Sequence, residues 1–534
     1  MKKIGILALI CAMSIGVWAI PARRGGITIV QPDGSEITVF QHGDEHFHWQ
    51  TNEKGEWLKL DDDGFYRITE ALSVEQVEAK RAQSASRVAQ AAVPLNVAPR
   101  GLVMLVNFTD VAFETEKAEM DSMLNGKNYT RTYSYTYRGK TYFVDSEGSA
   151  SQYFYESSYG QYNPQFDVVG PITVNKNMAY YGKNGYDDFD QAPWTMVKEA
   201  CEIADTLYNI DFAEYDNDDD GYVDFVYVIY AGFGEADGGG ANTIWPHSYN
   251  LEDAGLRCII DNKRVDLYAC GNELDFYSKI HTGIGAFCHE FSHVLGLPDL
   301  YVTNNATHNT LGMWSVMDYG PYNNESNTPP SYTAYERFFM GWLQPRLITE
   351  PGNVVLEDLQ DSQEALLIST TDVHNLVGND PSPTTFYLLE NRQQKGWDLY
   401  LPGHGLMLTK VQYTYNKWFQ NTVNNSSSKM GVDIIEADGK SSREGDARDL
   451  FPAGATQYLA IDAHPIEGIE ENDGIITFQY KKEPGTAVED AEVGEFIIAI
   501  YNILGQQQSS TKLNELPRGT YIIKTMTGSR KIVR

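Results

Sequence analysis

Apolar and polar residues alternate near the start of the chain, in short stretches that turns separate. The turns contain Gly, Pro or Asp, as in residues 32–35. A period of two places every second side chain on the same face, which predicts strands with one buried face. Residues 20–72 are therefore predicted to form a small β-rich unit. Its predicted strands are 27–30, 37–40, 47–50, 57–60 and 66–68.

The same alternation returns after about residue 346, again between turns that contain Gly, Pro and Asn. Short alternating strands separated by such turns predict a β-sandwich, here over residues 346–485. Its predicted strands are 354–356, 365–368, 386–390, 406–411 and 432–435.

The centre of the chain carries two different patterns. Residues 101–106 are an apolar run, which predicts a buried strand. Ile284, Phe287, Phe291 and Leu295 recur at helical spacing, which predicts a helix with one apolar face. The predicted fold class is therefore multidomain, with an α/β unit followed by all-β units.

Two histidines lie on this predicted helix, because residues 289–299 read HEFSHVLGLPD. Histidines four residues apart share one face of a helix, so both rings can reach one metal ion. Gly296 accepts the left-handed conformation that ends helices, and the resulting turn can bring Asp299 back as a third ligand. The motif predicts a zinc site formed by His289, His293 and Asp299.

Glu290 gives this predicted site its chemistry. Three protein ligands leave the fourth position of a tetrahedral zinc open, as in catalytic zinc sites. Glu290 would lie beside the metal and take a proton from water as a general base. The alternative is an ordinary amphipathic helix with two solvated histidines. The histidines lie off the apolar stripe, which favours the metal site.

An acidic run, residues 216–224, predicts a second metal site. Carboxylates at alternate positions followed by a glycine suit a hard cation such as calcium. The predicted ligands are Asp216, Asp218, Asp220 and Asp224. The run is not an EF-hand, because Tyr227 occupies the position of the closing glutamate. A solvated acidic turn is the alternative.

A segment downstream of Asp299, residues 312–320, resembles the Met-turn of metzincin proteases. In that clan a methionine forms an apolar floor under the zinc, which here would be Met317. In some members a tyrosine two residues later reaches the metal or the developing oxyanion, which implies a catalytic role for Tyr319. A packed aromatic residue is the alternative for Tyr319.

With these motifs, the chain resembles the M6 peptidases, the immune inhibitor A group of secreted bacterial metalloproteases. The likeness extends over about residues 100–455. It implies a zinc endopeptidase that hydrolyses proteins, with residues 101–345 as a metzincin-like α/β catalytic domain and Asp299 as its third ligand. Further strings that carry the likeness are 216–224, 245–247, 340–343, 390–392, 401–403 and 435–439.

The charge of the chain limits the classes of partner that are expected. The chain has 73 acidic and 41 basic residues and a net charge of -32. Such a surface repels nucleic acid and anionic membranes, so neither is expected as a partner. No long apolar segment follows the first residues, so no membrane span is expected in the mature chain.

The first residues resemble a secretory signal. Lys2 and Lys3 precede the apolar run 4–17, which is too short for a comfortable membrane span, and cleavage is expected after Ala19. Residues 20–100 then combine the β-rich unit with a basic linker. A unit of this kind ahead of a protease predicts a propeptide that keeps a zymogen latent.

Two features of the exported chain stay open. The cluster Asp44, Glu45, His46 and His48 either supplies an inhibiting ligand or consists of solvated turn residues. The four cysteines outside the signal permit two disulfides in three connectivities, of which Cys258 with Cys270 would close a short loop.

The C-terminus, residues 486–534, resembles the sorting domain of type IX secretion substrates in Bacteroidetes. The likeness rests on the apolar run 496–504, the string 516–524 and the ending 528–534. It implies contact with the secretion machinery, and a location outside the cell or on the outer-membrane surface of a Gram-negative, Bacteroidetes-like bacterium. A plain β-sandwich cap is the alternative.

Two other functions are compatible with the motifs. One is a surface adhesin or binding protein on an inactive protease fold, which the intact HExxH motif disfavours. The other is a zinc hydrolase acting on non-peptide bonds, which the predicted propeptide disfavours.

Overall fold

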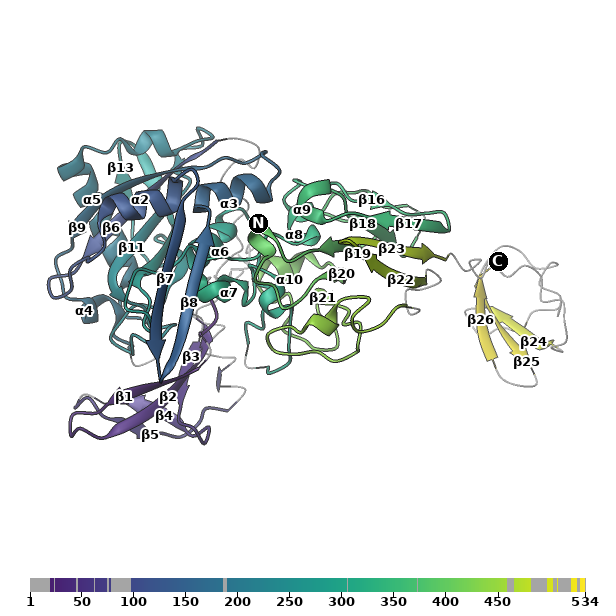
Figure 1. Ribbon diagram of the computed structural model, residues 1–534, viewed down its shortest axis with the longest axis horizontal. Helices are drawn as coiled ribbons and strands as arrows, with labels where there is room; N and C mark the ends of the chain where they lie inside the picture. Colours follow the sequence, from purple (N-terminus) through teal and green to yellow (C-terminus); the bar gives the residue numbers. More distant parts are fainter. Residues whose placement is uncertain are drawn as a thin grey trace, which may run out of the picture.

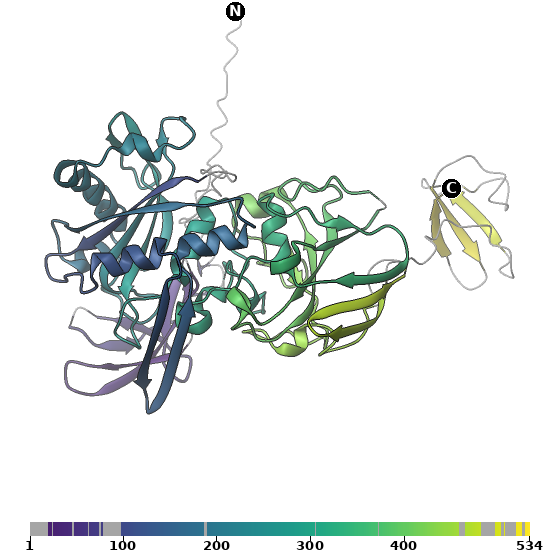
Figure 2. The ribbon, with the colours of Figure 1, turned by 45° about the horizontal axis from the view of Figure 1, so that its top comes forward.

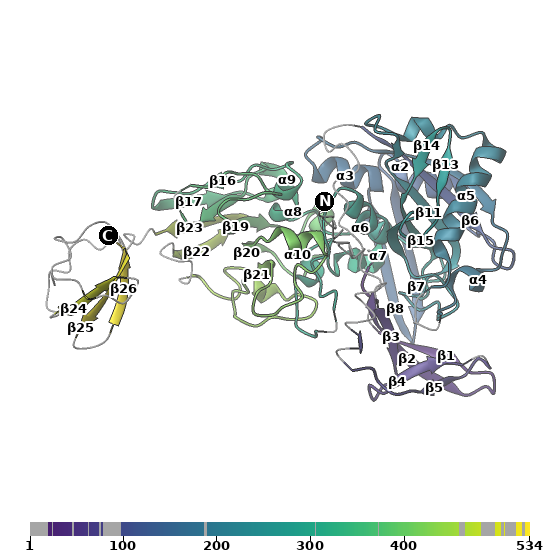
Figure 3. The ribbon, with the colours of Figure 1, turned by 180° about the vertical axis from the view of Figure 1, so that it is seen from behind.

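A computed structural model of the chain shows several sheets with helices packed on them (Figures 1–3). The predicted signal and most of the basic linker lie outside the described residues. The structure describes residues 20–23, 25–44, 47–61, 63–73, 76–77, 98–185, 190–304, 306–371, 373–458, 465–481, 497–502, 507, 520–525 and 529–533.

The N-terminal sheet is an antiparallel meander in which each strand pairs with the next one along the chain. One face buries Val39, Leu58 and Tyr66. The alternating pattern therefore predicted both the strands and their buried face. The strands are β1 (Gly26–Val30), β2 (Glu36–Asp44), β3 (Phe47–Thr51), β4 (Trp57–Leu60) and β5 (Tyr66–Ile68).

The central sheet has the strand order β12-β15-β11-β6-β9, with four parallel strands and β12 antiparallel at one edge. The apolar run of β6 is buried on both faces, as predicted. Leu102 and Met104 pack in one hydrophobic cluster, while Val103 and Leu105 pack in another. The strands are β6 (Arg100–Asn107), β9 (Gln165–Thr173), β11 (Val226–Phe233), β12 (His247–Asn250) and β15 (Leu267–Leu274).

Helices cover both faces of this sheet. Helix α5 (Pro193–Tyr208) packs in the cluster of Leu102, and α6 (Gly285–Val294) packs in the cluster of Val103. The other helices of this region are α2 (Lys117–Asn125), α3 (Ala150–Ser157), α4 (Met178–Gly182), η1 (Phe212–Tyr215), η2 (Gly312–Trp314), η3 (Gly320–Tyr322), α7 (Asn323–Ser326) and α8 (Ala334–Phe339).

A two-stranded hairpin leaves the central unit and reaches the N-terminal sheet, as Figures 1 and 2 show. Arg138, at the hairpin turn, donates a hydrogen bond to the Thr28 hydroxyl at 2.6 Å. The hairpin strands are β7 (Thr130–Tyr137) and β8 (Lys140–Glu147). A small sheet nearby has the order β10-β14-β13, with strands β10 (Tyr222–Val223), β13 (Cys258–Ile260) and β14 (Lys263–Val265).

Beyond residue 345, two further sheets follow. The larger has the order β16-β18-β19-β20-β21, and the smaller has the order β17-β23-β22. The strands are β16 (Arg346–Leu347), β17 (Gly352–Leu356), β18 (Leu366–Ser369), β19 (Thr385–Arg392), β20 (Gly405–Gln412), β21 (Val432–Ile434), β22 (Ile466–Asn472) and β23 (Ile475–Tyr480). The helices are α9 (Leu359–Ser362), η4 (Gly396–Asp398), α10 (Tyr415–Phe419) and η5 (Ala447–Asp449).

The larger of these sheets is buried on both faces. Tyr387 and Leu389 of β19 share a hydrophobic cluster with the smaller sheet. Phe386 and Leu388 of the same strand belong to the cluster that contains Phe291 of α6. The hydrophobic core therefore runs without interruption from the central unit into the β-rich region.

The C-terminal residues form a separate three-stranded antiparallel sheet, with β24 (Ile497–Asn502), β25 (Thr520–Thr525) and β26 (Ser529–Val533). None of the helices in the described residues has the length and apolar character needed to span a membrane.

The four cysteines of the described residues are buried free thiols. Cys201 of α5 lies against Cys258 of β13, and the two thiols interact. The structure therefore contains no link between Cys258 and Cys270.

Candidate active site

Helix α6 begins at a close contact between its own backbone and that of η3. A side-chain Cβ at Gly285 would lie 1.9 Å from the carbonyl oxygen of Pro321 in η3. Only glycine permits this approach, because any other residue would collide with backbone atoms. The contact fixes the start of the histidine helix against the segment that follows Met317.

The three predicted zinc ligands come together in the structure. The Nε2 atoms of His289 and His293 are 3.2 Å apart, and they lie 3.2 and 3.4 Å from Oδ1 of Asp299. All three side chains are buried. Zinc bonds of about 2.0–2.1 Å at tetrahedral angles separate ligand atoms by about 3.3 Å. The observed spacing fits one zinc ion.

The hydrogen bonds around these side chains also favour a cation. Nδ1 of His289 donates to the carbonyl of Val316 at 2.7 Å, and Nδ1 of His293 donates to that of Leu297 at 2.8 Å. In the neutral form of each ring, Nε2 therefore carries the lone pair. Oδ1 of Asp299 is buried without a hydrogen-bond partner. Three electron-pair donors thus converge on one point, which suits a metal ion.

Asp299 is held by the turn after α6 and by a distant asparagine. Gly296 has a φ of +93°, so the left-handed turn expected there is present. Asn421 donates to Oδ2 of Asp299 at 2.5 Å and accepts from the Asp299 backbone N–H at 2.8 Å. These two bonds aim Oδ1 at the histidines. Asn421 belongs to the β-rich region, where the sequence predicted no chemistry.

Glu290 lies beside this group and is completely buried. Its Oε1 accepts a hydrogen bond from the backbone nitrogen of Ile20 at 3.0 Å, and its Oε2 has no hydrogen-bond partner. Burial, reinforced by the charge of Asp299, raises the pKa of Glu290 well above its usual value. The carboxylate is therefore positioned to exchange a proton beside the three ligands.

The contact with Ile20 is part of a longer interaction that the sequence did not reveal. The N-terminal segment, residues 20–23, lies across the site. The Trp245 indole donates to the carbonyl of Ile20 at 3.2 Å, and the Tyr322 hydroxyl donates to that of Pro21 at 2.6 Å. The Arg23 backbone N–H donates to the carbonyl of Ala236 at 2.8 Å. No pattern in the sequence predicts that residues 20–23 lie against the candidate active site.

His48, one of the residues considered as an inhibiting ligand, lies elsewhere. Its ring stacks on Trp245 with centroids 4.5 Å apart, and its Nε2 is 3.5 Å from Oε2 of Glu235. It is not part of the group that holds His289. The side chains of Asp44, Glu45 and His46 lie outside the described residues.

The predicted Met-turn lies against the first histidine. Met317 is fully buried, and its backbone follows Val316, the residue that orients His289. The Met317 carbonyl also accepts from the backbone N–H of Leu300, next to Asp299. Tyr319 is half-buried and lines a pocket of about 510 Å³ together with Tyr322 and Arg23.

Three of the four predicted calcium ligands also come together. Asp216, Asp218 and Asp220 offer carboxylate oxygens within 4.8 Å of one another. Asp224 is not in this group, because its Oδ2 accepts from the backbone and side-chain nitrogens of Asn217 at 2.6 and 2.8 Å. Asp224 instead stabilises the acidic loop through these two hydrogen bonds. The ammonium group of Lys263 lies 2.5 Å from Asp216.

The central part of the chain is similar to a known protein family. Residues 96–345 match the model described as "Immune inhibitor A peptidase M6, catalytic domain". This match supports an M6 peptidase catalytic domain in the part of the chain that contains α6 and the converging ligands.

Two relatives agree with that match. The "Pre-pro-metalloprotease PrtV" of Vibrio cholerae serotype O1 is 25% identical over 282 residues, which are 46% of this chain and 30% of the relative. "Immune inhibitor A" of Bacillus thuringiensis subsp. alesti is 27% identical over 299 residues, or 50% of this chain and 43% of the relative. The chain thus spans less than half the length of these curated relatives.

Proposed function

We propose that the protein is a zinc-dependent endopeptidase that hydrolyses peptide bonds of proteins and is made as a zymogen. The observation that carries this proposal is the convergence of His289, His293 and Asp299 beside the buried carboxylate of Glu290. The likeness of residues 96–345 to M6 peptidases supports it.

Glu290 is the proposed catalytic residue. When bound, zinc would polarise the scissile carbonyl and acidify the water beside it. Glu290 takes the proton of the attacking water as general base and then gives it to the leaving amine as general acid. Its position next to His289 in the chain places the carboxylate beside the ligands without a further element. Tyr319, on the rim of the pocket, is proposed to stabilise the developing oxyanion.

The N-terminal unit is proposed to keep the precursor latent. The backbone nitrogen of Ile20 donates a hydrogen bond to Oε1 of Glu290. Residues 20–23 would thereby fill the space that a substrate needs. Ile20 is also the first residue after the predicted signal cleavage at Ala19. The name of the relative PrtV, a pre-pro-metalloprotease, agrees with such an organisation. Removal of the unit would open the site.

The decisive test is casein hydrolysis by the wild type and by the Glu290→Gln variant, after an added protease has removed the N-terminal unit from both proteins. The variant should bind zinc like the wild type but hydrolyse casein about 100- to 10,000-fold more slowly. Glu202→Gln, an exposed glutamate on α5, serves as the matched control and should remain active. Substantial hydrolysis by Glu290→Gln would reject the role of Glu290. Zinc in both proteins with activity in neither would favour a binding protein on an inactive protease fold.

A structural calcium ion is proposed at Asp216, Asp218 and Asp220, the three carboxylates that lie within 4.8 Å of one another. The cation would take over the charge balance that Lys263 provides at Asp216. Calcium should raise the thermal midpoint of the wild type but not of Asp218→Asn/Asp220→Asn. An equal shift in both proteins would place the ion elsewhere.

Export completes the proposal. The likeness of residues 486–534 to type IX sorting domains supports passage through that secretion machinery, and the described strands β24, β25 and β26 form an antiparallel sheet. The proposed location is outside the cell or on the outer-membrane surface of a Bacteroidetes-like bacterium. Deletion of residues 486–534 should leave the protease inside the producing cell.

A further inference from the structure

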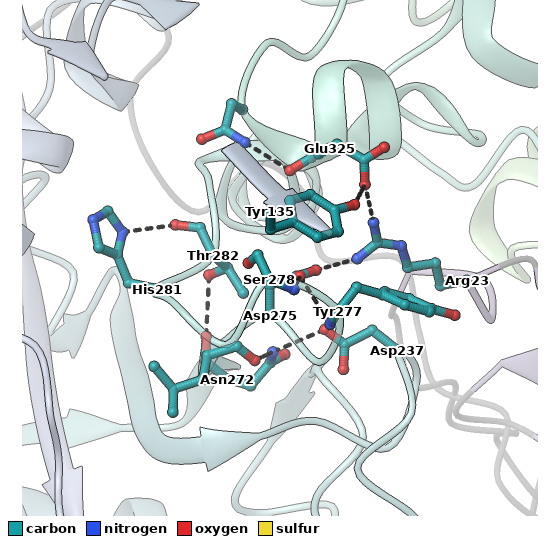
Figure 4. Close-up of polar contacts among 12 residues, drawn as sticks. Arg23, Tyr135, Asp237, Asn272, Asp275, Tyr277, Ser278, His281, Thr282 and Glu325 are labelled. Atoms are coloured by element: carbon teal, nitrogen blue, oxygen red, sulfur yellow. Dashed lines mark hydrogen bonds and ion pairs between the residues drawn. The ribbon is translucent and has the colours of Figure 1, made fainter. Parts of the chain in front are cut away.

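The side chain of Arg23 fills an acidic site in the catalytic part of the chain (Figure 4). Its guanidinium forms ion pairs with Asp275 and Glu325, and its Cζ lies 4.4 Å from the centre of the Tyr277 ring. Only 12% of the side chain is exposed. The carboxylates of Asp275, Glu325 and Asp237 raise the pKa of Arg23 although burial opposes its charge. The site therefore holds a fully charged basic group.

The walls of this site are fixed by their own hydrogen bonds. Oδ1 of Asp275 accepts from the backbone N–H groups of Tyr277 and Ser278 at 3.0 and 2.7 Å, which leaves Oδ2 for the guanidinium. The Tyr135 hydroxyl donates to Oε2 of Glu325 at 2.7 Å. None of these bonds involves the N-terminal segment, so they can hold Asp275 and Glu325 in place after Arg23 has left.

A third carboxylate strengthens the need for a cation. Asp237 is 7% exposed, and its Oδ1 is buried without a hydrogen-bond partner. The other cations near the site, including Arg138 and Lys140 of the same pocket, have partners of their own. Lys279 lies over the Phe276 ring at 3.7 Å, and Arg131 donates to Asn327 and to backbone carbonyls. Departure of Arg23 would leave three carboxylates together in a poorly solvated place, which is costly unless Asp237 takes up a proton or another cation enters.

One chain segment links this site to the proposed catalytic carboxylate. Arg23 follows Ile20, which contacts Glu290, by three residues, and both lie in one segment. The pocket of about 510 Å³ that Tyr319 lines also reaches Arg23, Tyr277 and Glu325. A peptide that follows the path of residues 20–23 would thus present one side chain to these carboxylates.

We propose that the site formed by Asp237, Asp275, Glu325 and Tyr277 is a substrate subsite that selects an arginine or lysine side chain after the N-terminal segment has left. This inference rests on the proposed protease function. Arginine fits best, because its planar guanidinium can bond two carboxylates at once while its face packs on the tyrosine ring. The precursor would occupy the subsite with the side chain that the enzyme itself prefers.

The test uses the full chain after activation and a library of peptides from a digested proteome, with the cleaved bonds read by mass spectrometry. Arginine and lysine should be enriched at one fixed position relative to the cleaved bond. A matched pair of fluorogenic peptides then carries arginine or its neutral isostere citrulline at that position. The wild type should favour arginine in kcat/KM by about 10- to 100-fold, as expected for hydrogen bonds between charged groups.

The variant Asp275→Asn/Glu325→Gln should lose most of this ratio, whereas the control Asp205→Asn/Glu202→Gln on the exposed face of α5 should keep it. Since the ratio is first measured on the wild type, a poorly folded variant does not remove the test. Casein hydrolysis without enrichment, or a ratio that survives loss of both carboxylates, overturns the subsite but not the protease. Absence of any Glu290-dependent hydrolysis overturns the proposed function, and the subsite falls with it.

Discussion

The backbone nitrogen of Ile20 donates to Oε1 of Glu290 at 3.0 Å, although the two residues are 270 positions apart. The contact joins the start of the described chain to the proposed general base. Trp245 and Tyr322 bind the carbonyls of Ile20 and Pro21, so the segment is held at further points along the chain. The most reactive carboxylate of the proposed site is thereby covered by the chain itself.

Arg23 should control how firmly this cover is held. Replacing it with glutamine removes two ion pairs that are largely shielded from water, so Arg23→Gln should speed self-processing of the precursor about 10-fold or more. The measurement is the rate at which the N-terminal unit is lost, followed by gel electrophoresis. Arg67→Gln is the control, because Arg67 pairs with Asp61 and Asp63 on the exposed surface of the same unit. Equal rates for both variants would contradict a latch at Arg23.

Docking of the segment should also tighten as the pH rises. Burial and the charge of Asp275 raise the pKa of Asp237 to about 7, whereas Arg23 lowers it. Withdrawal of Arg23 raises this pKa further, so docking releases a proton and is favoured at higher pH. In Glu290→Gln, which should not process itself, exchange of the Arg23 amide relative to its intrinsic rate should be slower at about pH 8 than at about pH 6. Asp237→Asn should abolish that difference, and a difference that persists would assign the effect to another group.

Asn421 should determine how well the metal is held. It supports Asp299 through two hydrogen bonds, and loss of such a partner costs about 10- to 100-fold in metal affinity. Zinc affinity of Asn421→Ala, measured by competition with a chelator, should fall by that factor. Asn416→Ala, an exposed residue of α10, should bind zinc like the wild type. Unchanged affinity in both variants would show that Asp299 needs no such support.

The start of α6 should tolerate no side chain. Because a Cβ at Gly285 would lie 1.9 Å from the Pro321 carbonyl, Gly285→Ala forces the helix and η3 apart. The thermal midpoint should fall by about 2–12 °C, as expected for an overpacked core. Gly352→Ala is the comparison, because its Cβ would meet nothing within 4 Å. A Gly285→Ala protein as stable as Gly352→Ala would contradict the close packing.

Local patterns in the sequence predicted the features that depend on near neighbours. The spacing of His289 and His293, and the turn at Gly296 that returns Asp299, are properties of a single helix and its end. Strands β1 and β17 also lie within a residue or two of the predicted ranges. In each case the period of the buried side chains carries the information.

Contacts between distant parts of the chain were not predictable in the same way. Asn421 lies 122 positions from Asp299, and nothing in its neighbours distinguishes it from other turn asparagines. Asp224 belongs to an acidic run whose composition fits a cation site, yet it bonds Asn217. Leu388 alternates like any strand residue, and only the packing shows that it shares a core with Phe291. Tertiary packing determines these contacts, and it produces no periodic pattern in the local sequence.

The most direct test of the account is a crystal structure of the full chain with diffraction recorded on both sides of the zinc absorption edge. The account predicts one zinc signal about 2.0–2.2 Å from Nε2 of His289, Nε2 of His293 and Oδ1 of Asp299. A zinc signal bound by other residues, or none at these three atoms in a protein that contains zinc and hydrolyses casein, would contradict it.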